Sequence, residues 1–232
     1  MNSSATTTLN RPSVIKALVM KDLQIMKVPS LCYWLGGILA VLMAIFYGDA
    51  AGTIAFILFI SVLFGAGVHS AMQTVTEERR EQNLPFIMSL PITIRDYTTA
   101  KMIANLLLVG GIWISLSAAS YVIFIGDVMP GGTIPFMTII LVQVLLAYII
   151  ILATTVIFEG LAPALIAVVG ANLGSQALIW LVSDLHGVRS TVNGTEAIWN
   201  GTYLTILGLQ WGSIGALIGT TFLAQSRKTE FI

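Results

Sequence analysis

The residues of this chain that could do chemistry are concentrated in one short stretch, residues 76–101. The whole chain has 232 residues, of which 11 are basic and 11 acidic, and eight of these charged residues fall within the stretch. They are Glu77, Glu78, Arg79, Arg80, Glu81, Arg95, Asp96 and Lys101. The sequence on either side is apolar and almost uncharged. Charge gathered in one internal segment predicts a loop that is presented to a partner in water.

Paired carboxylates such as Glu77 and Glu78 can serve acid–base catalysis, and in some membrane proteases a similar pair acts with histidines. Here the only histidines are His69 and His186, and the pair lies among other charges. A protease site is therefore disfavoured. The sequence also lacks the GxxxxGK[ST] loop that binds phosphates, and its single cysteine, Cys32, excludes an internal disulfide and a cysteine-based metal site. We expect no catalytic residue, cofactor or metal in this chain.

The composition places the chain in a membrane. Apolar residues make up 56% of it and charged residues 9%, whereas an average soluble domain is roughly 25% charged. In lipid, the backbone polar groups of a spanning segment must be satisfied internally, which favours helices of about 20 apolar residues. We therefore expect an all-α, polytopic membrane protein.

Six apolar stretches predict six transmembrane helices. They lie near residues 31–47, 52–72, 102–125, 134–158, 161–182 and 203–224. The fourth and fifth are separated by Glu159, Gly160 and Pro163, residue types that favour a turn. The spans hold no acidic or basic residue well inside, so a proton- or sodium-driven carrier is disfavoured, and we expect His69 to pack or lie at the interface.

The N-terminal part of the chain divides into residues 1–12, expected to be a flexible tail, and residues 13–29, expected to be an interfacial elbow helix. The helix has an apolar arc with lysines opposite, as in helices that lie on a membrane. An extension of the first span is the alternative, and Pro29 counts against it. Asp22, which follows Lys21, falls inside the apolar arc and should need a cationic partner. The sequence does not identify that partner.

The distribution of Lys and Arg predicts the orientation of the chain. The N-terminal arm, the charged loop and the C-terminal tail contain ten of them: Arg11, Lys16, Lys21, Lys27, Arg79, Arg80, Arg95, Lys101, Arg227 and Lys228. The opposite connections contain only Arg189. Because positive residues favour the cytoplasmic side, both termini and the loop are predicted to be cytoplasmic.

Glycines mark a possible packing face in the last span. Gly208, Gly212, Gly215 and Gly219 are spaced four, three and four residues apart, so they share one side of a helix. Such a face allows close approach of another helix. It would serve either a subunit interface or packing within one subunit, and the spacing does not decide between them.

The charged loop, residues 74–101 in full, is expected to contain three parts. Residues 74–82 extend the second span as a helix, residues 83–90 form a short apolar helix between prolines, and Thr93 with Asp96 caps the third span. The short helix either folds back on the membrane or the N-terminal helix, or docks on a cytoplasmic partner. The docking candidates are Glu77, Glu78, Arg79, Arg80, Glu81, Leu84, Phe86, Ile87, Met88 and Leu90.

Residues 78–101, ERREQNLPFIMSLPITIRDYTTAK, resemble the signature of ABC transporter permeases of the type-2, or export, class. The similar features are an acidic residue, a Leu-rich turn, a Ser-Leu-Pro step, a basic residue and a Lys that opens the third span. The Lys-Asp-Leu at 21–23 is also similar to that class. One departure is Asn-Leu-Pro at 83–85, where many relatives have a Gly-Thr-like step.

The resemblance implies a permease in the cell membrane of a prokaryote. It would pair with a second permease subunit as a homo- or heterodimer, in contact with membrane lipids, and each subunit would dock a cytoplasmic ATP-binding subunit that holds ATP and Mg²⁺. Two other classes remain open, namely a non-transporting membrane anchor or scaffold and an ion-coupled carrier. No feature points to nucleic acid. Uncharged polar groups in the spans, such as Gln143 and Gln210, suit an apolar or amphipathic cargo.

Overall fold

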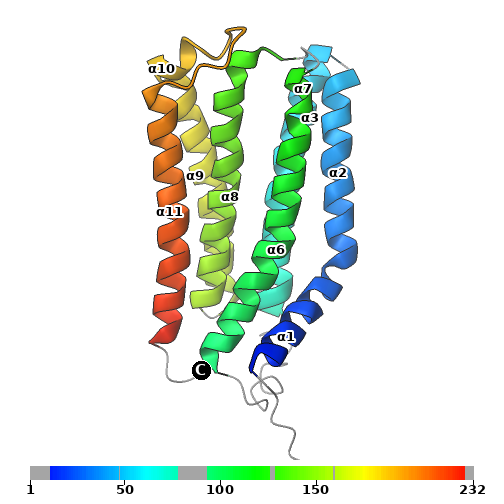
Figure 1. The fold of residues 1–232 in the computed structure, drawn as a ribbon, viewed down its shortest axis with the longest axis vertical. Helices are drawn as coiled ribbons and strands as arrows, with labels where there is room; N and C mark the ends of the chain where they lie inside the picture. The colour runs from blue at the N-terminus through cyan, green and yellow to red at the C-terminus, as the bar shows by residue number, and fades with distance from the viewer. Residues whose placement is uncertain (1–10, 47, 78–92, 126–128, 159, 228–232) are drawn as a thin grey trace, which may run out of the picture.

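The structure is a computed structural model that describes residues 11–46, 48–77, 93–125, 129–158 and 160–227. Within these ranges the chain forms a bundle of long helices and no strand (Figure 1). Residues 1–10 of the predicted tail and most of the predicted docking segment, residues 78–92, lie outside the described residues. Arg11 and Pro12, which the prediction assigned to the tail, instead begin α1. The all-α, multi-pass fold expected from composition is confirmed.

The helices follow one another along the chain with short connections. They are α1 (Arg11–Ile25), α2 (Lys27–Phe46), α3 (Gly48–Ala71), the π-helix η1 (Met72–Thr76), α6 (Ile94–Ser120), α7 (Val122–Ile125), the 3₁₀ helix η2 (Gly131–Thr133), α8 (Ile134–Ile157), α9 (Leu161–Asp184), α10 (His186–Arg189) and α11 (Gly201–Ser226). Six helical segments among the described residues are long and apolar enough to cross a membrane. The six predicted spans are therefore confirmed.

Two boundaries differ from the expectation. The elbow helix α1 ends at Ile25, and Pro29 lies in the first turn of α2, where a proline is tolerated because its missing N–H has no helical acceptor there. The expected α-helical extension of the second span, residues 74–82, is described only to Glu77, and this part belongs to a π-helix in which the Glu77 N–H donates to the Met72 carbonyl oxygen.

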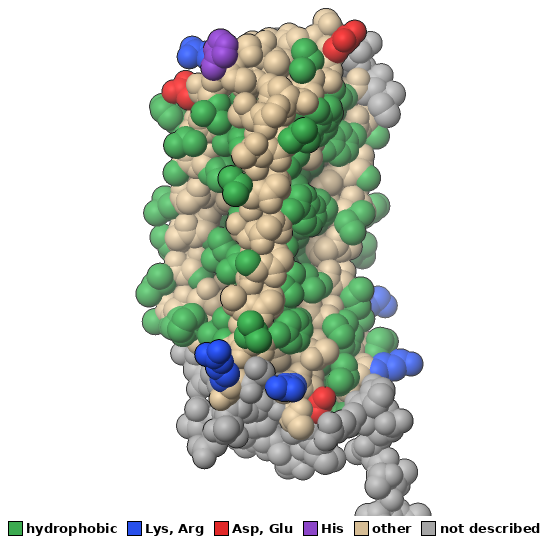
Figure 2. Space-filling model, turned by 60° about the vertical axis from the view of Figure 1, so that its left-hand side comes forward, with side chains coloured by type: hydrophobic (Ala, Val, Ile, Leu, Met, Phe, Trp, Pro, Cys, Tyr) green, Lys and Arg blue, Asp and Glu red, His purple; other side chains and the backbone are tan. Residues whose placement is uncertain are grey.

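The bundle has two ends, named here by their elements. The proximal end carries α1 and the C-terminal end of α11, and the distal end carries α7, η2 and α10 (Figure 1). On the face shown in Figure 2, hydrophobic side chains are spread over the middle of the bundle and charged side chains lie toward the two ends. This distribution suits a bilayer around the middle.

Helix α8 is the central helix of the bundle. Of the 18 most apolar consecutive residues in its span, 72% are buried, against 11% for α9 and 17% for α2 and for α11. Leu141, Tyr148 and Leu152 of α8 are almost wholly enclosed by neighbouring helices. The outer helices thus keep broad apolar faces for lipid or for another subunit.

At the distal end, residues 185–200 fold back on η2 and the start of α11. The Gly132 N–H donates to the Gly194 carbonyl oxygen at 2.8 Å, and the Thr133 hydroxyl donates to the Val192 carbonyl oxygen at 3.0 Å. The Asn200 side chain caps α11 by accepting from the Thr202 N–H at 3.0 Å. These bonds hold the fourth and sixth spans together at one end.

Candidate functional site

The elbow helix is joined to the third span by a buried ion pair. Lys101 Nζ of α6 lies 3.0 Å from Asp22 Oδ1 and 2.9 Å from Asp22 Oδ2 of α1, and each side chain is 1% exposed. Lys101 Nζ also lies 5.4 Å from the centre of the Tyr97 ring. Lys101 is therefore the cationic partner that the sequence required for Asp22 without identifying it.

The apolar arc of α1 packs around this pair. Val14, Leu18 and Val19 of α1 form a buried cluster with Ala100 and Ala104 of α6. Part of the arc that the sequence assigned to the membrane interface thus covers protein. The small alanines let α1 lie close to α6, so water is excluded and the two charges depend on each other.

A second polar group, one turn beyond Lys101, ties α6 to the end of α3. The Asn105 amide donates to the Lys101 carbonyl oxygen at 3.0 Å and to the Thr74 hydroxyl at 2.8 Å. Asn105 Oδ1 accepts from the Ser70 hydroxyl at 2.8 Å, and the Thr74 hydroxyl donates to the Ser70 carbonyl oxygen at 2.7 Å. All these side chains are buried, so α3, η1 and α6 are fixed to one another at this level.

We call the Asp22–Lys101 pair together with Ser70, Thr74 and Asn105 the proximal junction. It joins three elements: the elbow helix and the two helices that flank residues 78–92. The sequence showed only a partial signal for it, because Asp22 and Lys101 are charges next to apolar helix faces. Their separation of 79 residues gave no reason to pair them.

The predicted docking residues are divided by the limits of the described structure. Glu77 ends η1 at the proximal junction. The other candidates, Glu78, Arg79, Arg80, Glu81, Leu84, Phe86, Ile87, Met88 and Leu90, lie outside the described residues. The C-terminal end of the loop, where α6 begins, is described. Thr93 and Asp96 form the predicted capping box there. The Asp96 N–H donates to the Thr93 hydroxyl at 3.2 Å, and the Thr93 N–H donates to Asp96 Oδ2 at 3.0 Å.

A separate polar network lies in the interior of the bundle. Gln210 of α11 donates to Gln143 Oε1 of α8 at 3.0 Å and to the Ile139 carbonyl oxygen at 3.2 Å. The Gln143 amide donates to the Ser175 hydroxyl of α9 at 3.2 Å. The three side chains are buried and link the fourth, fifth and sixth spans. The sequence showed that Gln143 and Gln210 are polar residues within spans, but it did not predict that they contact each other.

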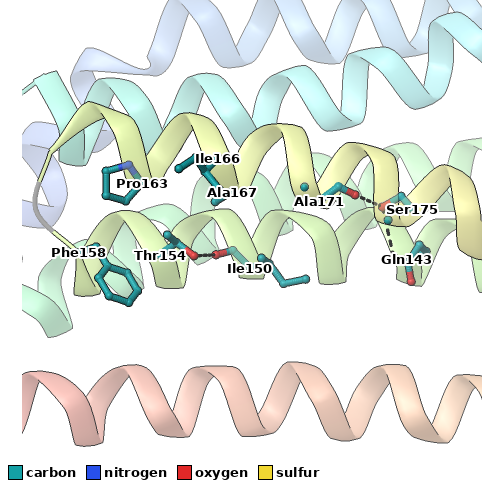
Figure 3. A pocket seen from close by; sticks show the side chains of 11 residues that line it. Gln143, Ile150, Thr154, Phe158, Pro163, Ile166, Ala167, Ala171 and Ser175 are labelled. Atoms are coloured by element: carbon teal, nitrogen blue, oxygen red, sulfur yellow. Dashed lines mark hydrogen bonds between the residues drawn. The ribbon is translucent and has the colours of Figure 1, made fainter.

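This network lies at one end of a groove between α8 and α9. The groove has a volume of about 680 Å³ and runs from Gln143 and Ser175 to Phe158 and Pro163 at the α8–α9 connection (Figure 3). Gly170 and Gly174 belong to its wall, and a Cβ on either would meet no atom within 4 Å. The groove is thus an open, largely apolar channel along the bundle with a polar end.

Amide side chains also lie on the outer side of α9. The Gln176 amide donates to Asn172 Oδ1 at 3.1 Å, and Gln176 is exposed. Both residues are in the fifth span. Hydrocarbon would leave their remaining hydrogen-bonding groups unsatisfied, so this side of α9 favours a protein or aqueous neighbour.

The predicted glycine face of α11 is open in this chain. Gly208, Gly212, Gly215 and Gly219 are not covered by other helices, and a Cβ on any of them would meet no atom within 4 Å. Of the two alternatives left open by the sequence, packing within one subunit does not occur among the described residues. A subunit interface on this face stays a prediction.

The described residues hold no cluster of metal-binding side chains, and His69 lies against a tyrosine. No group of three His, Cys, Asp or Glu side chains in the described ranges could hold a metal ion. The His69 Nδ1 is 3.2 Å from the Tyr33 hydroxyl, and the two rings pack edge to face. His69 is thus placed as a packing residue between α2 and α3.

Comparison with known proteins identifies a family. A family model described as "ABC-2 family transporter protein" matches residues 17–224, which include α2 to α10 whole and most of α1 and α11. No curated protein and no solved structure matches the chain.

Proposed function

Because the chain belongs to the ABC-2 transporter family, we propose that it is the permease subunit of an ATP-driven exporter. In this proposal it acts as a dimer, with a separate ATP-binding subunit docked on residues 78–92 of each copy. The proximal end faces the cytoplasm, as the excess of Lys and Arg in its segments favours.

The observation that carries the coupling role is the proximal junction. A loop can move spanning helices only if its two flanking helices are stiff and attached to the bundle. The Ser70, Thr74 and Asn105 bonds connect both flanking helices immediately above the loop. The Asp22–Lys101 pair connects the elbow helix to the same point. Force applied to the loop would therefore reach α1, α3 and α6 together.

Docking predicts that loop variants lose the ATP-binding subunit. Arg79→Glu with Arg80→Glu, or Phe86→Asp, should abolish its recovery with an affinity-tagged permease, because the first reverses charge on the expected stem and the second puts a charge on the expected apolar docking surface. The partner to co-express is the ATP-binding subunit that this proposal requires. The yield of inserted permease should not change.

Arg189→Glu is the matched control for this experiment. Arg189 is an exposed arginine at the distal end, with its side chain 77% exposed. Its reversal should leave recovery of the ATP-binding subunit at the wild-type level. Full association in both loop variants would contradict the docking assignment. No recovery of the ATP-binding subunit with the unsubstituted permease would favour a membrane protein without an ATP-binding partner.

We place the dimer contact and the cargo pathway on α9. The groove and its open glycines lie on this helix, which is the least buried of the six spans. A second copy that packs on the open glycines would enclose the groove. The enclosed channel would suit an uncharged or amphipathic cargo, because its polar groups are amides and hydroxyls.

This placement predicts different effects for two glycine substitutions. Gly174→Leu on α9 should weaken dimerisation at least about fivefold, since overpacking a contact costs roughly 1–3 kcal/mol. It should leave the subunit folded, because a Cβ at this position meets nothing in its own chain. Gly212→Leu on α11, equally open, should leave the dimer intact. Fluorescence energy transfer between labelled subunits in liposomes measures both, and the reverse pattern would move the interface to α11.

A further inference from the structure

A second cavity lies at the distal end of the bundle, away from the junction and the groove. It has a volume of about 470 Å³ and is lined by α2, α3, α6, α7, η2 and α8. Apolar and aromatic side chains form most of its wall, among them Ala44, Phe59, Ile123, Met137 and Ile140. Phe59, Met137 and Ile140 are each less than 10% exposed, so they face the cavity from inside the bundle.

Water is a poor occupant for this cavity. A buried water needs two to four polar partners. The Ser120 hydroxyl in the wall donates to the Ser117 carbonyl oxygen at 2.7 Å, and the Thr133 hydroxyl donates to the Val192 carbonyl oxygen at 3.0 Å. The third hydroxyl, that of Thr53, lies on an exposed residue at the rim and so is not in the deep part of the cavity. The deep part of the cavity is therefore apolar.

An empty cavity is also unfavourable. An apolar cavity of about 150 Å³ already binds benzene, and the destabilisation caused by a void grows with its volume. A methylene group is about as large as a water molecule, which occupies about 30 Å³, so this cavity holds roughly 15 methylene groups. That is the size of one hydrocarbon chain. The elements that form it belong to four of the membrane spans, so lipid chains surround it at high concentration.

We propose that the distal cavity binds one acyl chain of a membrane lipid. The acyl chain enters at the rim, which is formed by the exposed residues Thr53, Met129 and Pro130. Inside the cavity it lies against Phe59, Met137 and Ile140. The lipid head group stays outside the rim at the distal membrane surface. The site is independent of the proposed export function, because it shares no wall residue with the α8–α9 groove.

The test is photolabelling of the full-length protein in liposomes that contain phosphatidylcholine with a diazirine at the end of one acyl chain. After illumination, mass spectrometry locates the label. We expect label on Phe59, Met137 and Ile140, which lipid on the outer surface does not reach. Leu63 is the internal control: it lies one turn along α3 and is 3% exposed, as Phe59 is, but it does not line the cavity. Leu63 should stay unlabelled.

A variant that fills the cavity completes the experiment. Ala44→Phe places a ring in the cavity from α2 and should reduce the label on Phe59 and Met137 at least about fivefold. Ala118→Phe adds the same ring on an exposed position of α6 and should change nothing. The proposal is overturned if exposed Ile57 is labelled while Phe59 is not, if Leu63 is labelled as strongly as Phe59, or if Ala44→Phe leaves the label unchanged.

Discussion

Replacing Lys101 with methionine should lower the free energy of unfolding by about 3–5 kcal/mol, since it leaves a buried carboxylate without its cation. Asp22 is 0% exposed, and both of its carboxylate oxygens accept from Lys101 Nζ. Lys21 Nζ is 3.9 Å from Asp22 Oδ1, but its side chain is 41% exposed, so solvent screens its charge. The midpoint of thermal unfolding of the purified protein in detergent measures the loss.

Two further variants distinguish the effect of breaking the ion pair from the effect of removing any lysine. Lys16→Met removes an exposed lysine of α1 and should shift the midpoint little. Asp22→Leu combined with Lys101→Met replaces the pair by apolar side chains and should regain most of the stability, because no charge is left buried alone. If the double variant is less stable than Lys101→Met alone, the pair is not the cause of the loss.

The second large effect is expected from Gly132→Ala in η2. A Cβ at this position would lie 2.7 Å from the carbonyl oxygen and 2.9 Å from the amide nitrogen of Gly194, and would also press on the Thr191 carbonyl oxygen. These are backbone atoms, so the loop at 191–194 has to move and the bond from the Gly132 N–H to the Gly194 carbonyl is lost. We expect a loss of about 3 kcal/mol from overpacking and the broken bond together, measured as a lower midpoint of thermal unfolding.

Gly201→Ala provides the matched control at the same end of the bundle. Gly201 is the first residue of α11, and a Cβ there meets no atom within 4 Å. The substitution should be neutral or slightly stabilising, since alanine favours the helix over the unfolded chain. Equal midpoints for the two alanine variants would show that residues 191–194 do not constrain η2.

Much of the fold could be predicted from the sequence because it depends on local properties. The length of an apolar run decides whether it can span a membrane, and all six spans were found in this way. The capping box of Thr93 and Asp96 was also predictable, since its two residues are three apart. The end of α1 was not, because a proline is compatible with both a helix break and a first turn.

The proximal junction was beyond prediction for a physical reason. Asp22 and Lys101 come together only when α1 packs on α6, and a single sequence carries no record of that contact. The same holds for Asn105, which looked like one polar residue in a span and joins two helices. The docking role of residues 78–92 remains a prediction from the resemblance and from charge.

The π-helix at the end of the second span changes the direction in which the residues after it point around the helix axis. A π turn holds one more residue than an α turn, and each residue of an α-helix advances by about 100° around the axis. Glu77 therefore points about 100° away from the direction that an uninterrupted α3 would give it. A helical wheel drawn through residues 72–77 as a regular α-helix assigns Glu77 to the wrong side of the second span.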